Sequence, residues 1–221
     1  MRRERNGKPA PVETGMEVAV WSRKRRPALP RVIHRGTMTS SMNALHELPT
    51  IKDQTAFNLA RWAELCTDPL WVSIDGKIET DRYGQVIMNP PADPAHGGLQ
   101  ADLTVLLSKF APTGKIIVEC PVSTSEGVKV PDVVWVSKKR FPIIGGKSAL
   151  TAAPEICIEV LSPSNTRDEI EEKRRLYFAA GACEVWLCER DGRLRFFLST
   201  APARTARRSV LCPDMPGRIS K

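Results

Sequence analysis

The predicted fold rests on two apolar segments, Val130-Pro131-Asp132-Val133-Val134-Trp135-Val136 and Ile156-Cys157-Ile158-Glu159-Val160-Leu161. Each is rich in β-forming residues and carries a single carboxylate. A carboxylate near a low-dielectric interior must find a cation or a hydrogen-bond donor, or lose its charge. Two carboxylates on neighbouring strands would also repel each other, and a shared divalent metal is the usual relief. The two segments therefore predict a Mg²⁺ or Mn²⁺ site.

The spacing of the two acidic residues is compatible with such a site. Asp132 and Glu159 lie 27 residues apart, which leaves room for a strand, a loop and a neighbouring strand. If the strands pair, both side chains project at one end of the sheet, and Lys173 is the nearest cationic candidate downstream. Two carboxylates and a lysine suffice to bind a divalent ion, polarise a phosphodiester and position or deprotonate water. The pattern favours phosphodiester hydrolysis.

Composition bounds the class of protein. A chain of 221 residues with 42% hydrophobic and 26% charged residues is typical of a globular domain with tails. No apolar run approaches the roughly 18 residues of a membrane span, and the basic N-terminus is not followed by the apolar core of a signal peptide. The six cysteines form no CxxC pair, so we expect reduced thiols in the cytoplasm.

The net charge of +8 is a weak indicator of a polyanionic partner because it is concentrated at the ends of the chain. Residues 1–37 contribute +7 and residues 201–221 contribute +4, which leaves −3 for residues 38–200. The N-terminal segment is either a polyanion-binding tail or an upstream extension from a misassigned start codon, with Met38 and Met42 near the start of foldable sequence.

The chain is predicted to contain a basic, disordered extension (1–45), one folded domain (46–200) and a basic tail (201–221). Helical periodicity predicts helices over 50–66, 96–110 and 167–180. Strands are predicted over 71–74, 77–80, 85–88, 115–120, 128–137, 155–161, 184–189 and 194–198. This order is typical of an α/β fold with a central mixed β-sheet flanked by helices.

Several spaced motifs carry a family resemblance. The segment from Ala153 to Ser164 is followed by Glu169, Lys173, Tyr177, Gly181 and Glu184-Val185-Trp186-Leu187, and preceded by Pro94, His96 and Pro131-Asp132-Val133. Together they resemble the signature of the Uma2 (DUF820) family of bacterial endonucleases. The resemblance covers about residues 45 to 200 and implies membership of the restriction-endonuclease-like PD-(D/E)xK superfamily, with a central mixed sheet flanked by helices.

The resemblance implies that Asp132 and Glu159 are metal ligands in a Mg²⁺- or Mn²⁺-dependent endonuclease that acts on DNA. The superfamily lysine normally lies two residues after the glutamate, where this chain has Leu161. The Uma2-like pattern moves that lysine onto the following helix, as Lys173. The expected catalytic set is Asp132, Glu159, Lys173 and His96.

Each member of this set also has a structural alternative. Lys173 has a potential i, i+4 partner in Glu169 on the helix surface. His96 either begins a helix or orients substrate or metal. Glu119 is either a further ligand or a strand carboxylate paired with Lys129.

Two residue groups are expected to have structural roles. Tyr177, Phe178 and Trp186 are expected in the core, and Ser162 and Ser164 are expected to cap a helix.

Two other functions remain open from the residues alone. One is a non-catalytic binding or assembly module with the nuclease fold, favoured by the acidic central region unless residues 138–140, Lys-Lys-Arg, form a basic patch. The other is a nuclease that acts on RNA. Cutting both strands of DNA would favour a homodimer, for which the regions of Trp62 and Trp71 offer apolar surface.

Overall fold

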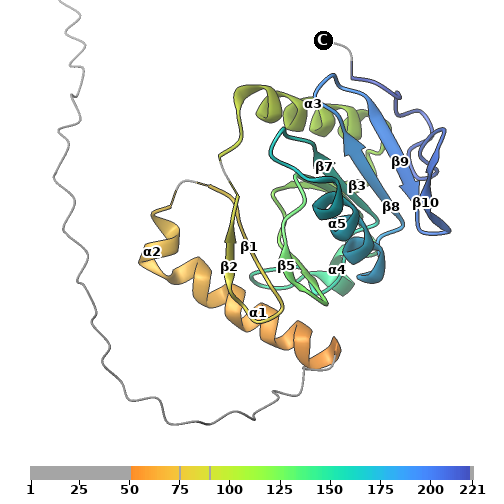
Figure 1. Cartoon of the computed structure of the whole chain (residues 1–221). Coiled ribbons are helices and arrows are strands. Elements are labelled where there is room, and N and C mark those ends of the chain that lie inside the picture. Colours follow the sequence, from red (N-terminus) through yellow and green to blue (C-terminus); the bar gives the residue numbers. More distant parts are fainter. Residues whose placement is uncertain (1–50, 75, 90, 220–221) are drawn as a thin grey trace, which may run out of the picture. The chain divides into compact units, whose positions relative to one another are not determined.

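The computed structural model describes residues 51–74, 76–89 and 91–219, so the predicted N-terminal extension lies outside the described residues. The helices are α1 (Ile51–Thr67), α2 (Pro69–Val72), α3 (Pro94–Phe110), α4 (Phe141–Ile144) and α5 (Arg167–Ala179). The strands are β1 (Ile78–Thr80), β2 (Val86–Met88), β3 (Gly114–Val118), β4 (Val122–Thr124), β5 (Gly127–Lys129), β6 (Val133–Ser137), β7 (Ile156–Val160), β8 (Glu184–Cys188), β9 (Leu194–Leu198) and β10 (Ala201–Ala206). Figure 1 shows their arrangement.

A six-stranded sheet forms the centre of the described domain, in the order β10-β9-β8-β7-β6-β3. Strands β7 and β8 run parallel, and every other neighbouring pair in this sheet is antiparallel. The predicted α/β fold with a mixed sheet flanked by helices is confirmed. The β6–β7 register pairs Val133 with Ile158, so the next position outward places Asp132 opposite Glu159.

Helices cover both faces of this sheet because residues in a strand alternate between its faces. On one face, Leu103 and Leu107 of α3 belong to the same buried cluster as Ile158. On the other face, Tyr177 of α5 packs in a cluster with Cys157. The alternation on β7 also directs Glu159, two residues after Cys157, toward the α5 face.

The remaining strands form two hairpins beside the sheet, β1–β2 and β4–β5. Lys129 of β5 donates its Nζ to the carbonyl oxygen of Thr80 at 2.9 Å, which ties the hairpins together. Gly127 has φ +93°, and a Cβ atom there would collide with the backbone of Asp81. The close approach of β5 to β1 therefore requires glycine, and it holds β1 next to the end of the central sheet.

The strand predicted over 71–74 is wrong, since the chain forms the short helix α2 at 69–72. The carboxylate of Asp68 accepts a hydrogen bond from the backbone N–H of Leu70 at 2.8 Å, and Pro69 occupies the first helical turn. An acidic N-cap followed by proline is a helix-start signal, and it outweighs the β-propensity of Trp71 and Val72.

The single strand predicted over 128–137 is also wrong, because Pro131 interrupts it and two separate strands form. Strand β5 pairs with β4 outside the central sheet, and β6 begins only at Val133. Proline has no N–H to donate to a ladder, so it separates the two strands. Asp132 thus directly precedes β6, outside the paired part of the strand.

The predicted division at residue 200 does not match the described structure, because the segment from 201 belongs to the fold. Strand β10 forms the edge of the central sheet, and Cys212, Met215 and Ile219 are buried in the α3-side cluster. The buried carboxylate of Glu184 accepts hydrogen bonds from the backbone N–H groups of residues 210 and 211. The folded domain therefore continues to residue 219.

The sequence suggested the Trp62 region as a dimer surface and predicted that no segment spans a membrane. Trp62 is only 6% exposed and packs with Leu65 and Val128, so it supplies no apolar interface surface. Within the described residues, every helix is too short or too polar to span a bilayer.

Candidate active site

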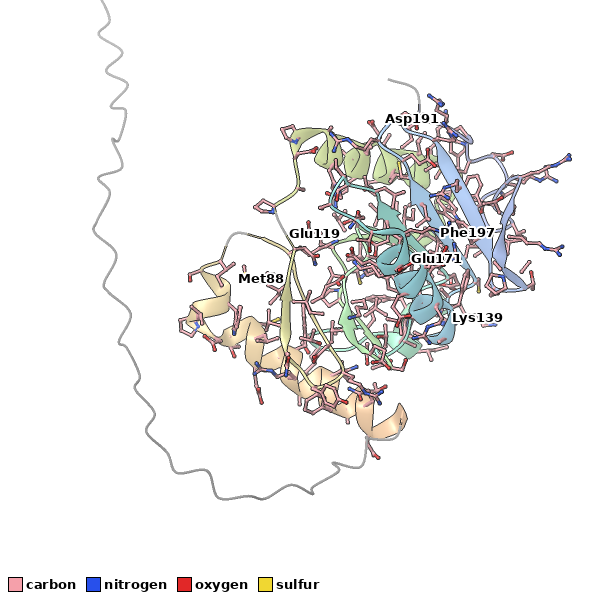
Figure 2. The ribbon with its side chains drawn as sticks, viewed as in Figure 1. Met88, Glu119, Lys139, Glu171, Asp191 and Phe197 are labelled. Atoms are coloured by element: carbon pink, nitrogen blue, oxygen red, sulfur yellow. The ribbon has the colours of Figure 1, made fainter. Side chains whose placement is uncertain are left out.

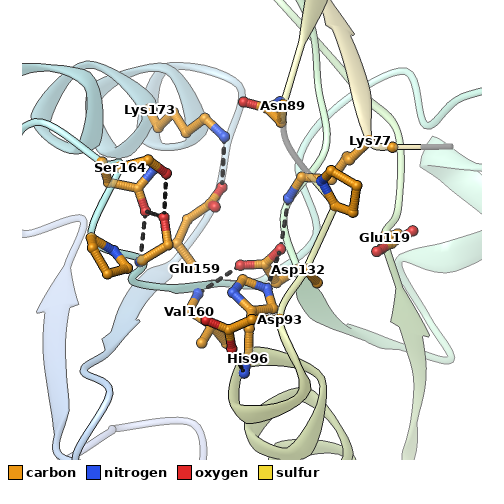
Figure 3. A pocket seen from close by; sticks show the side chains of 16 residues that line it. Lys77, Asn89, Asp93, His96, Glu119, Asp132, Glu159, Val160, Ser164 and Lys173 are labelled. Atoms are coloured by element: carbon orange, nitrogen blue, oxygen red, sulfur yellow. Dashed lines mark hydrogen bonds and ion pairs between the residues drawn. The ribbon is translucent and has the colours of Figure 1, made fainter.

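The four predicted site residues, Asp132, Glu159, Lys173 and His96, line one cavity of about 520 Å³. It opens at the end of the sheet where β6 begins and β7 ends, with α3, α5 and the β1–β2 hairpin around it (Figure 3). The structure thus brings together residues that the sequence spreads over 78 positions, from His96 to Lys173.

Asp132 is 2% exposed and is held by donors on both carboxylate oxygens. Its Oδ2 accepts from the backbone N–H of Val160 at 2.7 Å, and its Oδ1 lies 2.6 Å from Lys77 Nζ and 3.3 Å from His96 Nε2. Burial alone would raise the pKa of Asp132, but the His96 hydrogen bond and the charge of Lys77 lower it to about 2. Asp132 is therefore a firmly ionised carboxylate.

Glu159 is also buried, at 4% exposure, and has a different electrostatic environment. Its Oε1 accepts a hydrogen bond from the Tyr177 hydroxyl at 2.5 Å and lies 3.6 Å from Lys173 Nζ. Burial raises the pKa of Glu159, Lys173 opposes that rise, and the charge of Asp132 adds to it. Burial and the charge of Asp132 thus favour the neutral form of Glu159, whereas Lys173 favours the ionised form.

Lys173 is buried on the inner face of α5, at 7% exposure. Its Nζ donates to Glu79 Oε1 at 2.8 Å, and the same Glu79 oxygen accepts from the Val130 backbone N–H at 2.9 Å. Burial would lower the pKa of Lys173, but Glu159 and Glu79 outweigh it and raise the pKa. Lys173 is therefore a charged group shared by two buried carboxylates.

The alternative interpretation of Lys173 as a surface partner of Glu169 is wrong. Glu169 instead completes a capping box with Thr166, the N-cap residue of α5. Ser162 and Ser164, which were expected to cap this helix, lie in the preceding loop with their hydroxyls 2.7 Å apart.

His96 lies in the first turn of α3, where the carboxylate of Asp93 accepts from its backbone N–H at 2.9 Å. It therefore begins a helix and also faces the site through its ring. The hydrogen bond with Asp132 raises the pKa of His96, although burial opposes the rise. This hydrogen bond thus favours the protonated imidazole, and the same contact favours the ionised form of Asp132.

Sequence reasoning missed several polar residues of the site, among them Lys77, Glu79 and Asn89. Lys77 directly precedes β1 and Glu79 lies within it, and both reach site residues from a separate hairpin. Asn89 lines the same cavity, and its buried Nδ2 has no hydrogen-bond partner among the described residues. The only available signal was the Lys-Ile-Glu alternation, and surface strands commonly show the same pattern.

Glu119 occupies a different position from the one expected. It follows the end of β3 with φ 49°, in the left-handed region that few non-glycine residues adopt, and it lines the cavity rim. Lys129, its expected partner, instead binds the carbonyl of Thr80. The predicted pairing is therefore wrong, whereas Glu119 does reach the site.

The Lys138-Lys139-Arg140 segment does not border the cavity. It follows β6 at the end opposite Asp132, roughly 20 Å away along an extended strand at ~3.3 Å per residue. Arg140 also donates to the carbonyl oxygens of Ala153 and Gly181, at 2.7 and 2.9 Å. Residues 138–140 therefore do not form a basic patch beside the cavity that could bind a nucleic acid.

The donor set suits a hard divalent cation. No three His, Cys, Asp or Glu side chains form a ready-made metal cluster in the part of the chain that the structure describes. Mg²⁺, however, is commonly bound through one or two carboxylates and otherwise by waters and substrate phosphates. Asp132 and Glu159 line the same cavity and lie opposite each other at the ends of β6 and β7. These residues fit Mg²⁺ or Mn²⁺.

Comparison with known proteins finds a matching family model and a similar solved structure. The Uma2 family model, described as "Putative restriction endonuclease", matches residues 64–214. A solved structure described as a "putative nuclease belonging to DUF820 from Anabaena variabilis" is similar at 17% sequence identity and a TM-score of 0.48. The match covers 58% of this chain and 74% of that one. No curated protein matches the chain.

The mixed sheet flanked by helices, with two carboxylates opposite each other at its end, has the architecture that the sequence resemblance implied. The chain belongs to the Uma2 family, whose model covers more than half of its length.

Proposed function

We propose that this protein is a Mg²⁺- or Mn²⁺-dependent endonuclease that hydrolyses DNA phosphodiester bonds at the Asp132–Glu159 cavity. The observation that carries the proposal is the convergence of two opposed carboxylates, two lysines and a histidine on one open cavity. Family membership supports the reaction class. The reduced state of all six cysteines is compatible with a cytoplasmic setting.

In this proposal Asp132 and Glu159 hold the cation. Mg²⁺ held there would supply Lewis-acid polarisation of the phosphodiester and would lower the pKa of a bound water. Lys173, fixed by Glu79 and Glu159, presents a permanent positive charge toward the negative charge that develops on the phosphate. His96 and the Val160 N–H hold Asp132 in place, and the unpaired Asn89 amide offers a donor to a substrate oxygen.

A specific observation also favours the alternative of a non-catalytic binding module. Lys77 Nζ lies 2.6 Å from Asp132 Oδ1, so a lysine already neutralises the carboxylate that the metal would use. Under this alternative the lysines are permanent structural substitutes for the cation, and the cavity binds without cutting. In the nuclease proposal, Lys77 moves off Asp132 when the metal binds.

Cleavage of plasmid DNA tests the nuclease proposal directly. The wild-type protein should nick or linearise supercoiled DNA in Mg²⁺ or Mn²⁺ and not in EDTA. Asp132→Asn and Glu159→Gln should each lower the rate by at least about a hundredfold, the scale of losing a group that stabilises transition-state charge. Arg175→Met, an exposed change on the same helix as Lys173, should cut normally.

Two results would contradict the proposal. One is cutting by both carboxylate variants at the wild-type rate. The other is the absence of cutting of DNA in any form, together with the absence of a heat of Mn²⁺ binding in calorimetry, which would establish the binding module. Cleavage of RNA in preference to DNA would show that the substrate is RNA and that the DNA assignment is wrong.

A further inference from the structure

A second cavity, of about 760 Å³, adjoins the carboxylate cavity and shares Ser162 and Asn165 with it. It lies between the N-terminal half of α5 and the strands β8, β9 and β10. Four arginines and a single glutamate line it: Arg167, Arg174, Arg195, Arg204 and Glu171. Figure 2 labels Glu171 and Phe197, which both line this arginine groove.

Helix α5 connects the two cavities because its faces point in different directions. Lys173 and Tyr177 face the carboxylates. Arg167, Ile170, Glu171 and Arg174 recur at helical spacing and line the arginine groove. Arg167 and Arg174 are two helical turns apart, roughly 10 Å along the axis at ~1.5 Å per residue, which matches about three base-pair steps along a DNA duplex axis at ~3.4 Å each.

Arg174 lines the arginine groove and stacks on an aromatic ring. Its guanidinium carbon lies 4.1 Å from the centroid of the Phe197 ring, and Phe197 is itself only 3% exposed. Stacking on a buried aromatic ring fixes the planar group and leaves its N–H donors available at the edge. A rigid, planar donor of this kind suits bidentate binding of a phosphate.

The positive charge of the groove is only partly balanced by the protein. Arg167 pairs with Glu171 at 2.9 Å and Arg195 with Glu189 at 3.1 Å. Among the described residues, neither Arg174 nor Arg204 has a salt-bridge partner. Partial burial lowers the pKa of Arg174, Glu171 opposes this, and the neighbouring Arg195 and Arg167 lower it further. An anion placed in the groove would relieve this crowding of like charges.

We propose that the arginine groove binds the backbone phosphates of the DNA strand whose scissile bond enters the carboxylate cavity. This inference rests on the proposed function and supplies the basic surface that residues 138–140 do not provide. A strand that follows the groove passes the Ser162–Asn165 loop, whose hydroxyl and amide groups line both cavities. Contacts to the backbone give affinity without sequence preference, so the groove positions DNA but does not select its sequence.

The test measures binding separately from cutting. Fluorescence anisotropy of a labelled duplex DNA oligonucleotide is followed with the full chain in EDTA, over about 50 to 200 mM salt. Arg174→Ala and Arg204→Ala should each weaken binding about three- to tenfold and lower the slope of log K against log salt by about 1. Arg174→Lys should recover part of the affinity because it keeps the charge but loses the planar stack.

Lys138→Ala and Lys139→Ala are the matched controls, since each removes one positive charge at the opposite end of β6. Both should leave affinity and slope unchanged. Unchanged binding and slope in the Arg167, Arg174 and Arg204 triple alanine variant, with a wild-type melting temperature, would overturn the groove even if the wild type cuts DNA. Tighter binding of duplex RNA than of duplex DNA would overturn the DNA assignment.

Failure of the proposed function gives a different result. If the wild-type protein never cuts DNA but the groove variants lose affinity and slope as stated, the groove stands as a DNA-binding surface and the nuclease proposal fails. If Asp132→Asn abolishes cutting while all groove variants bind normally, the nuclease proposal stands and the groove proposal fails.

Discussion

Replacing Lys173 with methionine should strongly destabilise the protein. Methionine has a similar length and no charge, so the change leaves Glu79 and Glu159 as buried carboxylates without their common cation. Removing one partner of a buried ion pair costs about 3–5 kcal/mol. Solvent screens this ion pair very little, because Lys173 is only 7% exposed and its Nζ lies 2.8 Å from Glu79 Oε1. For a domain of this size the melting temperature should fall by about 10 °C.

Urea denaturation in EDTA measures this cost, with Arg175→Met as the control. Arg175 pairs with Glu172 at 2.6 Å, but both side chains are about half exposed, and such a pair contributes less than about 1 kcal/mol. Adding Glu79→Gln to Lys173→Met should recover stability, because it removes one of the two unpaired charges. The reasoning is refuted if Lys173→Met costs no more than Arg175→Met, or if the second change brings a further loss.

Three other perturbations have definite expected outcomes. Tyr177→Phe removes the donor to Glu159 and should cost about 1–3 kcal/mol in the same urea experiment; a neutral result would show that the hydrogen bond is unimportant. The pKa of Asp132 is lowered to about 2 from an ordinary 3.8, so its contribution to stability is present above pH 3.8 and is lost as the pH falls toward 2. Asp132→Asn should therefore flatten the acid side of the stability profile, and an unchanged profile would contradict the assigned pKa. A chain ending at Thr200 loses β10 and the buried Cys212, Met215 and Ile219. At about 1.5–3 kcal/mol for each large apolar side chain this approaches the whole stability of a domain, so calorimetry should show no cooperative transition; a normal transition would make the segment dispensable.

The sequence predicted the central elements well because their local patterns are strong. The helices around residues 96–110 and 167–180 form where apolar residues recur at helical spacing, and the strands containing Cys157 and Trp186 form where β-forming apolar residues run continuously. The sequence also predicted that Asp132 and Glu159 lie at one end of the sheet, because pairing of their two strands would bring both carboxylates there.

The parts that the sequence did not predict depend on contacts between distant segments. Lys77 and Glu79 join the site only because Gly127 lets β5 approach the β1–β2 hairpin. The C-terminal segment looked like a basic tail because its buried residues, Cys212, Met215 and Ile219, are separated by polar residues and prolines and follow no period. The repulsion between the carboxylates was anticipated, but the lysines that offset it come from the residue before β1 and from α5, and only the lysine on α5 was identified.

The central claim is that Asp132 and Glu159 together bind a catalytic divalent cation, and a crystal soaked in Mn²⁺ tests it most directly. The account predicts one anomalous peak within about 2.0–2.3 Å of an oxygen of each carboxylate, with Lys77 Nζ displaced from its position beside Asp132. A Mn²⁺ ion bound elsewhere, or Lys77 still in contact with Asp132 and no ion in the cavity, would contradict it.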